Sequence, residues 1–329
     1  MTTSEPNLSA VRSASALLLA RLGPLIGLII VAGSFAIAFP KFRTAGNVEV
    51  MFLQTAVVIT AALGMTMIII SGGIDLSVGS NVALCSVVVA LLLKAGYDPL
   101  TSAAGGVAAG AAAGLLIGVL VTMLRLQPFI VTLGMWGALR GLAKWLADDS
   151  VVFISEHTWL NRLVVRLSPE NQWMVLPSGL WLTLLLVLTV AGVLRYTRFG
   201  RHVFAVGSNE MTARLCGVRV NRTKVAVYTL AGALAGMAGV LQYAYVGLGD
   251  PTGAAGMELD VIAAVVIGGA SLSGGVGTVS GTIIGALLMT VVANGLTKFP
   301  DMRNSVQQIV TGTIIIIAAA LDRLRRRER

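Results

Sequence analysis

Long apolar blocks separated by short polar stretches make up most of the chain, and they predict a bundle of membrane-spanning helices. A helix needs about 20 apolar residues to cross the hydrocarbon core, whereas strands of a β-barrel show short alternating segments. We therefore expect an all-α, polytopic fold. About ten blocks qualify, with approximate limits 22–39, 50–70, 76–93, 101–123, 128–147, 176–194, 224–246, 258–271, 277–297 and 305–321. The eighth block is short enough to be re-entrant, which leaves the count open by one or two.

The polar stretches divide the chain into a cytoplasmic segment, 1–21, a transmembrane domain, 22–321, and a basic tail, 322–329. The first block is too long for the core of a signal peptide, so it is interpreted as an uncleaved span. Two loops are large. Loop 148–175 is mildly acidic and is expected outside, whereas loop 195–224 carries seven basic groups against Glu210 alone and is expected inside.

The distribution of lysine and arginine supports this topology. With the N-terminus inside, 15 of the 24 basic residues fall on the cytoplasmic side and 7 fall outside. Basic residues gather in cytoplasmic loops of membrane proteins. The bias predicts a multi-pass membrane protein with both termini in the cytoplasm.

The amino-acid composition is typical of an integral membrane protein. It is 56% hydrophobic and 12% charged, whereas soluble domains are about one quarter charged. The net charge of +9 belongs to the loops, and no basic patch interleaved with aromatic residues indicates nucleic-acid binding. Cys85 lies in an apolar run and Cys216 in the basic loop, so no disulfide is expected between them.

Several blocks carry small residues four positions apart, a spacing that lets helix backbones approach closely in lipid. This pattern predicts tight packing and says nothing about substrate. The glycines concerned are Gly106, Gly110, Gly114 and Gly118, then Gly232 and Gly236, and finally Gly277, Gly281 and Gly285.

One polar stretch interrupts the apolar pattern: SGGIDLSVGS, residues 71–80, whose Asp75 is the only charged residue between Val50 and Leu93. GGIDLSVG at 72–79 shares the pattern G-G-x-x-L-S-x-G with GGASLSGG at 268–275. The match is either a coincidence in a glycine-rich chain or a duplicated broken-helix element, which transporters use to place polar backbone along a pathway. The predicted topology puts both turns on the same side. Asp75 itself is interpreted either as a cap of the following helix or as a group acting in the pathway.

Residues for several kinds of catalysis and energy coupling are missing from the sequence. The two histidines, His157 and His202, fall in loops on opposite sides of the membrane, so no metal site or histidine base is expected in the bundle. GGVGTVSGT at 274–282 lacks the lysine of a P-loop. The ionisable residues at membrane depth are few, which disfavours ion coupling: Asp75, Arg140, Lys144, Glu258 and Asp260. We expect no catalytic residue and no cofactor, and a pathway driven by another subunit.

Four stretches in the same order resemble a known family, the permease subunits of ribose-type sugar ABC importers. They are ALGMTMIIISGGIDLSVGS (62–80), QPFIVTLGMWGALRGLA (127–143), TRFGRHVFAVGSNEMTARLCGV (197–218) and ELDVIAAVVIGGASLSGGVGTVSGTIIGALL (258–288). The similarity runs from about residue 45 to residue 321. It implies two permease chains, as a homodimer or with a similar chain, an ATPase subunit that binds the ATP, and a periplasmic or lipid-anchored sugar-binding protein.

The resemblance also assigns roles by position. Loop 195–224 would hold the helix that couples to the ATPase, with Glu210, Ala213, Arg214, Leu215 and Gly217. Family members often read N-E-E-A-A-R-L-S-G here, and this chain departs at Met211 and Thr212. Gly217 is expected to end the short helix in the left-handed conformation.

The remaining candidates belong to the pathway or its hinge. The first group comprises Gly72, Gly73, Asp75, Ser77 and Gly79 together with Gly268, Gly269, Ser271 and Ser273, and candidate lining residues are Gln127, Phe129, Gln242 and Asp260. Three alternatives stay open: a stand-alone secondary sugar carrier or facilitator, a branched-chain amino-acid-type ABC permease, and an intramembrane enzyme. Transport in proteoliposomes without any ATPase would favour the carrier.

Overall fold

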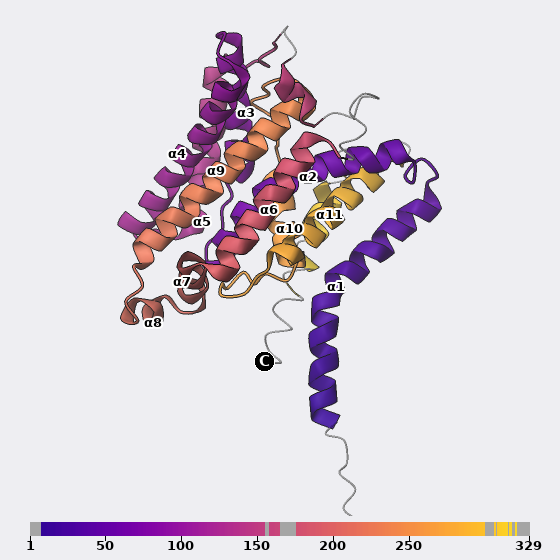
Figure 1. Ribbon diagram of the computed structural model, residues 1–329, viewed down its shortest axis with the longest axis vertical. Coiled ribbons are helices and arrows are strands. Elements are labelled where there is room, and N and C mark those ends of the chain that lie inside the picture. The colour runs from indigo at the N-terminus through magenta and orange to yellow at the C-terminus, as the bar shows by residue number, and fades with distance from the viewer. Residues whose placement is uncertain are drawn as a thin grey trace, which may run out of the picture.

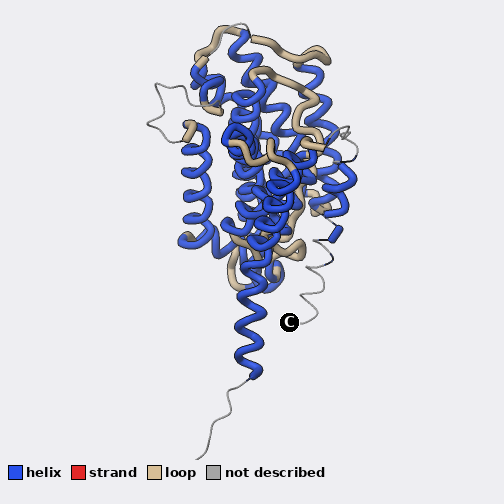
Figure 2. Tube along the Cα trace, turned by 90° about the vertical axis from the view of Figure 1, so that its right-hand side faces the viewer, coloured by secondary structure: helices blue, strands red, loops and turns tan. Residues whose placement is uncertain are grey.

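The computed structural model describes residues 8–154, 158–164, 176–299, 306, 308–314, 316–317 and 320, with side chains from Gly23 onward. In these ranges the chain forms helices joined by loops and no strand (Figure 1, Figure 2). The helices are α1 (Leu8–Ala38), α2 (Ala45–Ile70), α3 (Val78–Lys94), α4 (Pro99–Met123), α5 (Pro128–Leu146), η1 (Trp159–Arg162), α6 (Ser178–Tyr196), α7 (Arg198–Ser208), α8 (Glu210–Leu215), α9 (Val220–Val246), α10 (Met257–Ile267) and α11 (Val279–Leu296).

The predicted all-α membrane bundle is confirmed. Five described helices are long and apolar enough to cross a membrane, namely α2, α4, α6, α9 and α11. The eighth block is shorter than predicted, because α10 ends at Ile267 and the backbone leaves the helix at Gly268. The tenth block, 305–321, lies only partly within the described residues. Segment 1–7, much of loop 148–175 and tail 322–329 lie outside them.

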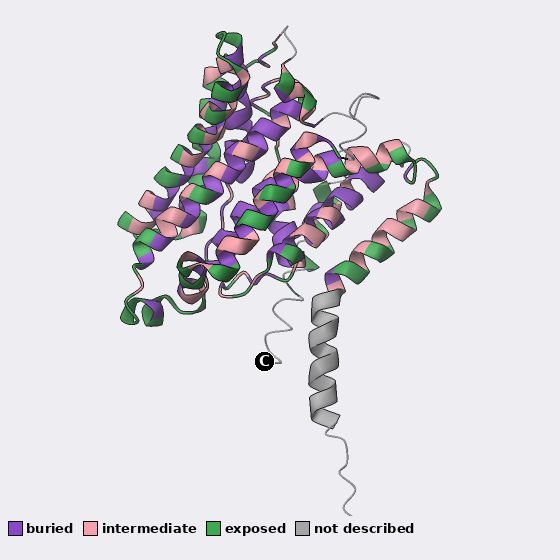
Figure 3. Ribbon diagram, viewed as in Figure 1, coloured by how far each residue is buried: buried purple, intermediate pink, exposed green. Residues whose placement is uncertain are grey.

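Helix α2 forms the centre of the bundle. It is apolar on all sides and is buried along most of its length, as expected for a helix enclosed by other helices. Figure 3 shows buried residues concentrated on α2, α9 and α11, with exposed residues along α1, α4 and α6. The α7–α8 pair lies at one end of the bundle (Figure 1), which we call the α7–α8 end.

The predicted glycine stripes are the contact surfaces between helices. A Cβ on Gly110 would lie 2.8 Å from the Gly236 backbone of α9, so α4 and α9 pack with their backbones in contact. The stripe of α11 serves the same purpose against α10, where Gly285 lies against Ala264. Close approach of this kind strengthens dispersion contacts in lipid, where burial of apolar surface drives little association.

The two cysteines are separate, as predicted. Cys85 is buried in α3, Cys216 is exposed after α8, and both are free thiols.

Candidate functional site

Helices α2 and α10 end in the same way. Gly72 follows α2 with φ +83°, and the amides of Gly72 and Gly73 donate to the carbonyls of Ile69 and Ile68. Gly269 follows α10 with φ +90°, and the amides of Gly269 and Ala270 donate to Val266 and Val265. Both ends are Schellman motifs, in which a left-handed glycine lets two amides close over the last turn. The predicted duplication is therefore real at the helix ends.

The duplication stops there, which corrects the sequence pattern in two respects. The pattern paired Gly72 with Gly268, whereas the left-handed residues are Gly72 and Gly269, one position out of register. Ser77 is the N-cap residue of α3, but its predicted counterpart Ser273 lies exposed within a longer loop. Ser271 is buried, and its amide donates to the Val276 carbonyl within that loop.

The end of α2 and the loop that follows α10 meet at one residue of α7, Gly207. The Gly275 amide donates to the Ile70 carbonyl at 2.8 Å and joins the loop after α10 to the end of α2. A Cβ on Gly207 would lie 2.7 Å from the Gly275 nitrogen, and a Cβ on Gly72 would lie 3.8 Å from the Gly207 Cα. The prediction that both turns lie on the same side is confirmed. Motion of α7 would press directly on the end of α2 and on the loop after α10.

Asp75 lies in the non-helical segment between α2 and α3, and it is 8% exposed. Its Oδ1 accepts hydrogen bonds from the Ser77 amide at 2.7 Å and the Ser77 hydroxyl at 2.6 Å. The prediction of a helix cap is wrong in detail, because an N-cap accepts from the second or third helical amide and α3 has no side-chain cap. Asp75 instead closes an Asx turn, which holds the non-helical segment in shape.

The space beside this segment is filled by α9 and α10. A Cβ on Gly73 would lie 2.5 Å from the Tyr228 hydroxyl of α9. A Cβ on Gly79 would overlap the Glu258 carboxylate and lie 2.7 Å from the Ala254 carbonyl oxygen. Both glycines are therefore needed for close packing.

The first turns of α3 and α10 meet near the middle of the bundle. Helix α10 has 11 residues and so is about 16 Å long, roughly half of the hydrocarbon core. It ends at the α7–α8 end and begins next to Gly79, after the non-helical segment 247–256. Glu258, in its first turn, consequently lies at about half the depth of the membrane.

A polar cluster at this depth joins α5 to α10. The Trp136 indole N–H donates to Glu258 Oε1 at 3.2 Å. Arg140, one turn further along α5, donates from Nη1 to the carbonyls of Pro251 at 3.0 Å and Gly253 at 2.6 Å. The sequence singled out Arg140 and Glu258 as ionisable residues at membrane depth but missed Trp136. The sequence signal that could have identified Trp136 is its spacing of four residues from Arg140, which places an aromatic residue and an arginine on the same face of one helix.

The four candidate lining residues are scattered. Gln127 is the N-cap residue of α5, followed by Pro128 at the first helical position, and Phe129 is 49% exposed. Asp260 lies in the first turn of α10, beside the polar cluster, while Gln242 lies near the far end of α9. Gln242 and Gln127 are therefore well separated along the bundle, and only Asp260 adjoins the cluster.

Helix α8 is built as a short, well-anchored projection. Asn209 caps it by accepting from the Thr212 amide at 2.9 Å, and Glu210 pairs with Lys224 at 2.6 Å and with Arg214 at 3.1 Å. The hydrogen bond from Lys224 is the main reason that the pKa of Glu210 is lowered from its ordinary value. Gly217, with φ +83°, ends the helix as predicted.

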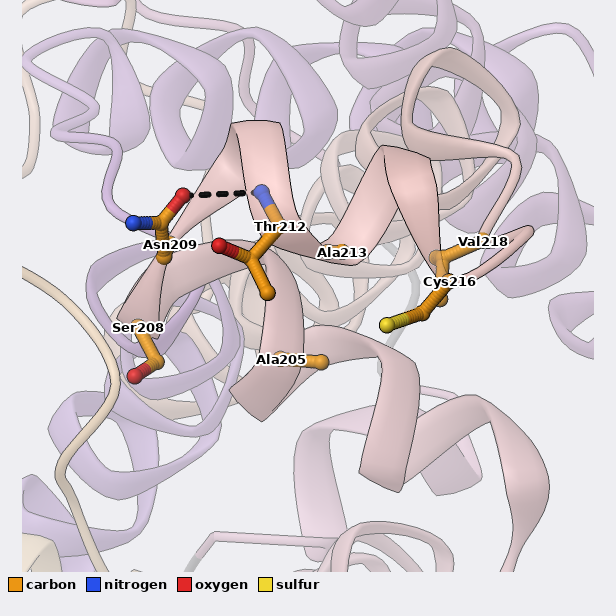
Figure 4. A pocket seen from close by; sticks show the side chains of 7 residues that line it. All are labelled: Ala205, Ser208, Asn209, Thr212, Ala213, Cys216 and Val218. Atoms are coloured by element: carbon orange, nitrogen blue, oxygen red, sulfur yellow. Dashed lines mark hydrogen bonds between the residues drawn. The ribbon is translucent and has the colours of Figure 1, made fainter.

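The outward surface of α8 is unusually apolar for a loop. Met211 is 75% exposed and Leu215 is 84% exposed, while Ala213 faces inward and is buried. Between α7 and α8 lies a cavity of about 220 Å³ (Figure 4). Its lining residues are Ala205, Ser208, Asn209, Thr212, Ala213, Cys216 and Val218.

A helical bundle with irregular backbone buried at its centre and a short helix projecting from one end is typical of the membrane domains of transport proteins. The chain belongs to the permease family described as branched-chain amino acid transport system / permease component, which matches residues 47–319.

Three named relatives show which kinds of permease the chain is similar to. YphD of Escherichia coli (strain K12), a probable ABC transporter permease protein, is 39% identical over 297 residues, which cover 89% of this chain and 87% of that protein. The ribose import permease protein RbsC of the same strain is 36% identical over 298 residues, 91% of this chain and 92% of RbsC. The L-arabinose ABC transporter permease protein AraH of Azospirillum brasilense is 34% identical over 312 residues, 95% and 90% of the two chains. No solved structure matches the chain. The resemblance predicted from the motifs is confirmed.

Proposed function

We propose that this chain is the permease of an ATP-driven sugar importer in the bacterial inner membrane, working with a separate ATPase and a sugar-binding protein. The similarity to ribose and L-arabinose permeases over about nine tenths of the chain carries this proposal. The family description names branched-chain amino acids. The relatives that are named by substrate favour a sugar.

Helix α8 is the proposed contact with the ATPase. Its two exposed apolar side chains, Met211 and Leu215, can fill a groove on a partner, and Arg214 can pair with an acidic rim. Glu210 ties the helix to Lys224 at the start of α9, so force on α8 passes into the bundle.

Transmission to the pathway runs through α7. Because Gly207 lies against the end of α2 and the loop after α10, a displacement of α7 moves that helix end and that loop together. In the proposed cycle, ATP-driven closure of the ATPases pulls on α8, and two copies of the chain open and close a cavity between them. ATP is bound by the partner subunit, and the permease supplies no cofactor of its own.

The proposed orientation puts both termini and the α7–α8 end in the cytoplasm. The excess of 15 basic residues over 7 supports it. The sugar-binding protein then docks at the opposite end, where loop 148–175 begins.

Reconstitution tests the proposal. The chain is coexpressed with its ATPase, purified and placed in proteoliposomes with the binding protein and labelled D-ribose, L-arabinose or D-allose. We expect uptake of at least one sugar that requires ATP, with Met211→Glu abolishing coupling while the thermal stability of the permease stays unchanged. Uptake without ATPase would instead identify a stand-alone carrier, and uptake of branched-chain amino acids alone would refute the sugar assignment.

A further inference from the structure

Helix α5 carries three glycines on one exposed face. A Cβ on Gly134, Gly137 or Gly141 would meet no described heavy atom within 4 Å. Gly110 and Gly114 of α4 lie instead against the backbone of α9. Large apolar side chains such as Leu133 are exposed on α5 too, so the distinctive feature is the run of three bare positions, which leaves open space beside this helix.

The polar cluster lies at the edge of this open face. Trp136 is 42% exposed, although its indole N–H donates to Glu258. The other carboxylate oxygen of Glu258, Oε2, is buried against Gly79 of α3 without a hydrogen-bond partner among the described residues, so Oε1 is the oxygen that lies toward Trp136. Both described hydrogen bonds of Arg140 use Nη1. Ionisable groups at membrane depth face a protein interior or a water-filled cavity rather than lipid tails, which argues against lipid as the only neighbour of this face.

We propose that the α5 face of Gly134, Trp136, Gly137 and Gly141 lines the sugar pathway, and that Trp136 with Glu258 forms a contact site for a sugar ring halfway across the membrane. This inference rests on the proposed function and names the residues that meet the substrate.

The chemistry of the site suits a neutral, hydroxyl-rich ring. A sugar presents C–H groups on its face, which pack against an indole, and hydroxyl groups on its rim. A carboxylate accepts hydrogen bonds from hydroxyl groups, and a guanidinium donates to them. The absent side chains at Gly134 and Gly137 leave room for the ring beside Trp136. One aromatic residue and few polar groups make a weak site, which a transported solute can leave as well as enter.

Water access tests the assignment without knowledge of the sugar. Two variants are made in a Cys216→Ser background: Gly137→Cys, and Leu188→Cys in the middle of α6 as a lipid-facing control. Both are treated with a charged methanethiosulfonate in the full importer. Cys85 is buried and stays in place. We expect rapid labelling at position 137, none at position 188, and slower labelling at 137 when D-ribose, L-arabinose or D-allose is transported.

Added bulk tests the pathway itself. Gly137→Leu should reduce uptake by at least about tenfold, because the added side chain starts from a Cβ that meets no described atom within 4 Å and projects into the pathway. A Cβ on Gly192 of α6 also meets no described atom within 4 Å, so Gly192→Leu serves as the matched control, with uptake unchanged. Trp136→Leu should slow uptake about tenfold, a loss equal to a contact of roughly 1.4 kcal/mol. Trp145→Leu, an exposed tryptophan near the end of the same helix, should leave uptake intact.

The outcomes separate this inference from the function on which it rests. ATP-driven sugar uptake with no labelling at position 137 and normal transport by Gly137→Leu overturns the inference alone. Dissociation of the permease dimer by Gly137→Leu also overturns it, since the face is then a helix contact between copies. If the unmodified importer transports none of the three sugars, the proposed function fails, and the sugar site fails with it.

Discussion

Replacing Gly207 with alanine should uncouple ATP hydrolysis from transport. The new Cβ would lie 2.7 Å from the Gly275 nitrogen and 2.8 Å from the Ile70 carbonyl carbon, whereas ordinary van der Waals contact begins at 3.4 Å. The nearest atom, the Ile70 carbonyl oxygen, would overlap the new Cβ, so helix α7 would have to retreat by more than the roughly 0.7 Å between 2.7 and 3.4 Å. Overpacking by one methyl group typically costs about 1–3 kcal/mol. Because the new Cβ would lie against both partners of the Gly275 to Ile70 hydrogen bond, it would also disturb this link between the end of α2 and the loop after α10.

The assay for this variant measures two quantities in proteoliposomes: ATP hydrolysis, and ATP-dependent uptake of sugar. We expect the ratio of uptake to hydrolysis to fall several-fold and the thermal unfolding temperature in detergent to drop. Gly192→Ala is the matched control, because it also adds a methyl group to a helix but meets no described atom within 4 Å. Alanine at position 192 should be neutral or stabilising by up to about 1 kcal/mol. Equal behaviour of the two variants in both measurements would refute the reasoning.

Three further outcomes are expected. Asp75→Asn should keep most of the stability because its amide oxygen still accepts from Ser77, whereas Asp75→Ala should lose about 1–3 kcal/mol in thermal unfolding; loss of transport by the asparagine variant alone would identify a role for the charge. Gly217→Ala should destabilise α8 by about 1 kcal/mol because φ is +83° there, measured as faster hydrogen exchange of α8. At pH 7, Glu210→Gln should speed the hydrogen exchange of α8 by roughly two- to fivefold, which is the factor expected from the loss of an exposed ion pair such as the one with Lys224. Since the pKa of Glu210 is lowered in the folded chain, its stabilisation is present above the ordinary glutamate pKa. The difference between the two proteins should therefore vanish as the pH falls through the lowered pKa, and a difference that persists there would contradict the ion-pair argument.

Features that depend on neighbouring residues were predictable from the sequence. The limits of α2, α4 and α9 follow from the lengths of apolar blocks, and the left-handed end of α8 follows from Gly217 after a short polar helix. The glycine stripes predicted close packing, although they did not say which helix would fill which stripe. Which helices pack together could be read only from the fold, in which α4 meets α9 and α11 meets α10.

The repeat shows where pattern matching fails. G-G-x-x-L-S-x-G located both helix ends, because a left-handed glycine is a local requirement of a Schellman motif. It placed the register one residue out and assigned equal roles to Ser77 and Ser273, because the loops that follow Gly72 and Gly269 differ in length and in what they pack against.

By itself the sequence determined that this chain is a helical membrane permease with a short helix projecting from a basic loop, since block length, charge bias and family motifs are all properties of contiguous residues. Only the tertiary structure decided that Gly207 contacts both the end of α2 and the distant loop after α10, that Asp75 bonds to Ser77 instead of capping α3, and that Trp136 meets Glu258 across 122 positions of the chain. The physical reason is that these contacts depend on which helices pack together and at what depth their regular backbone begins. Neither the packing partners nor the depth can be read from any single stretch of residues.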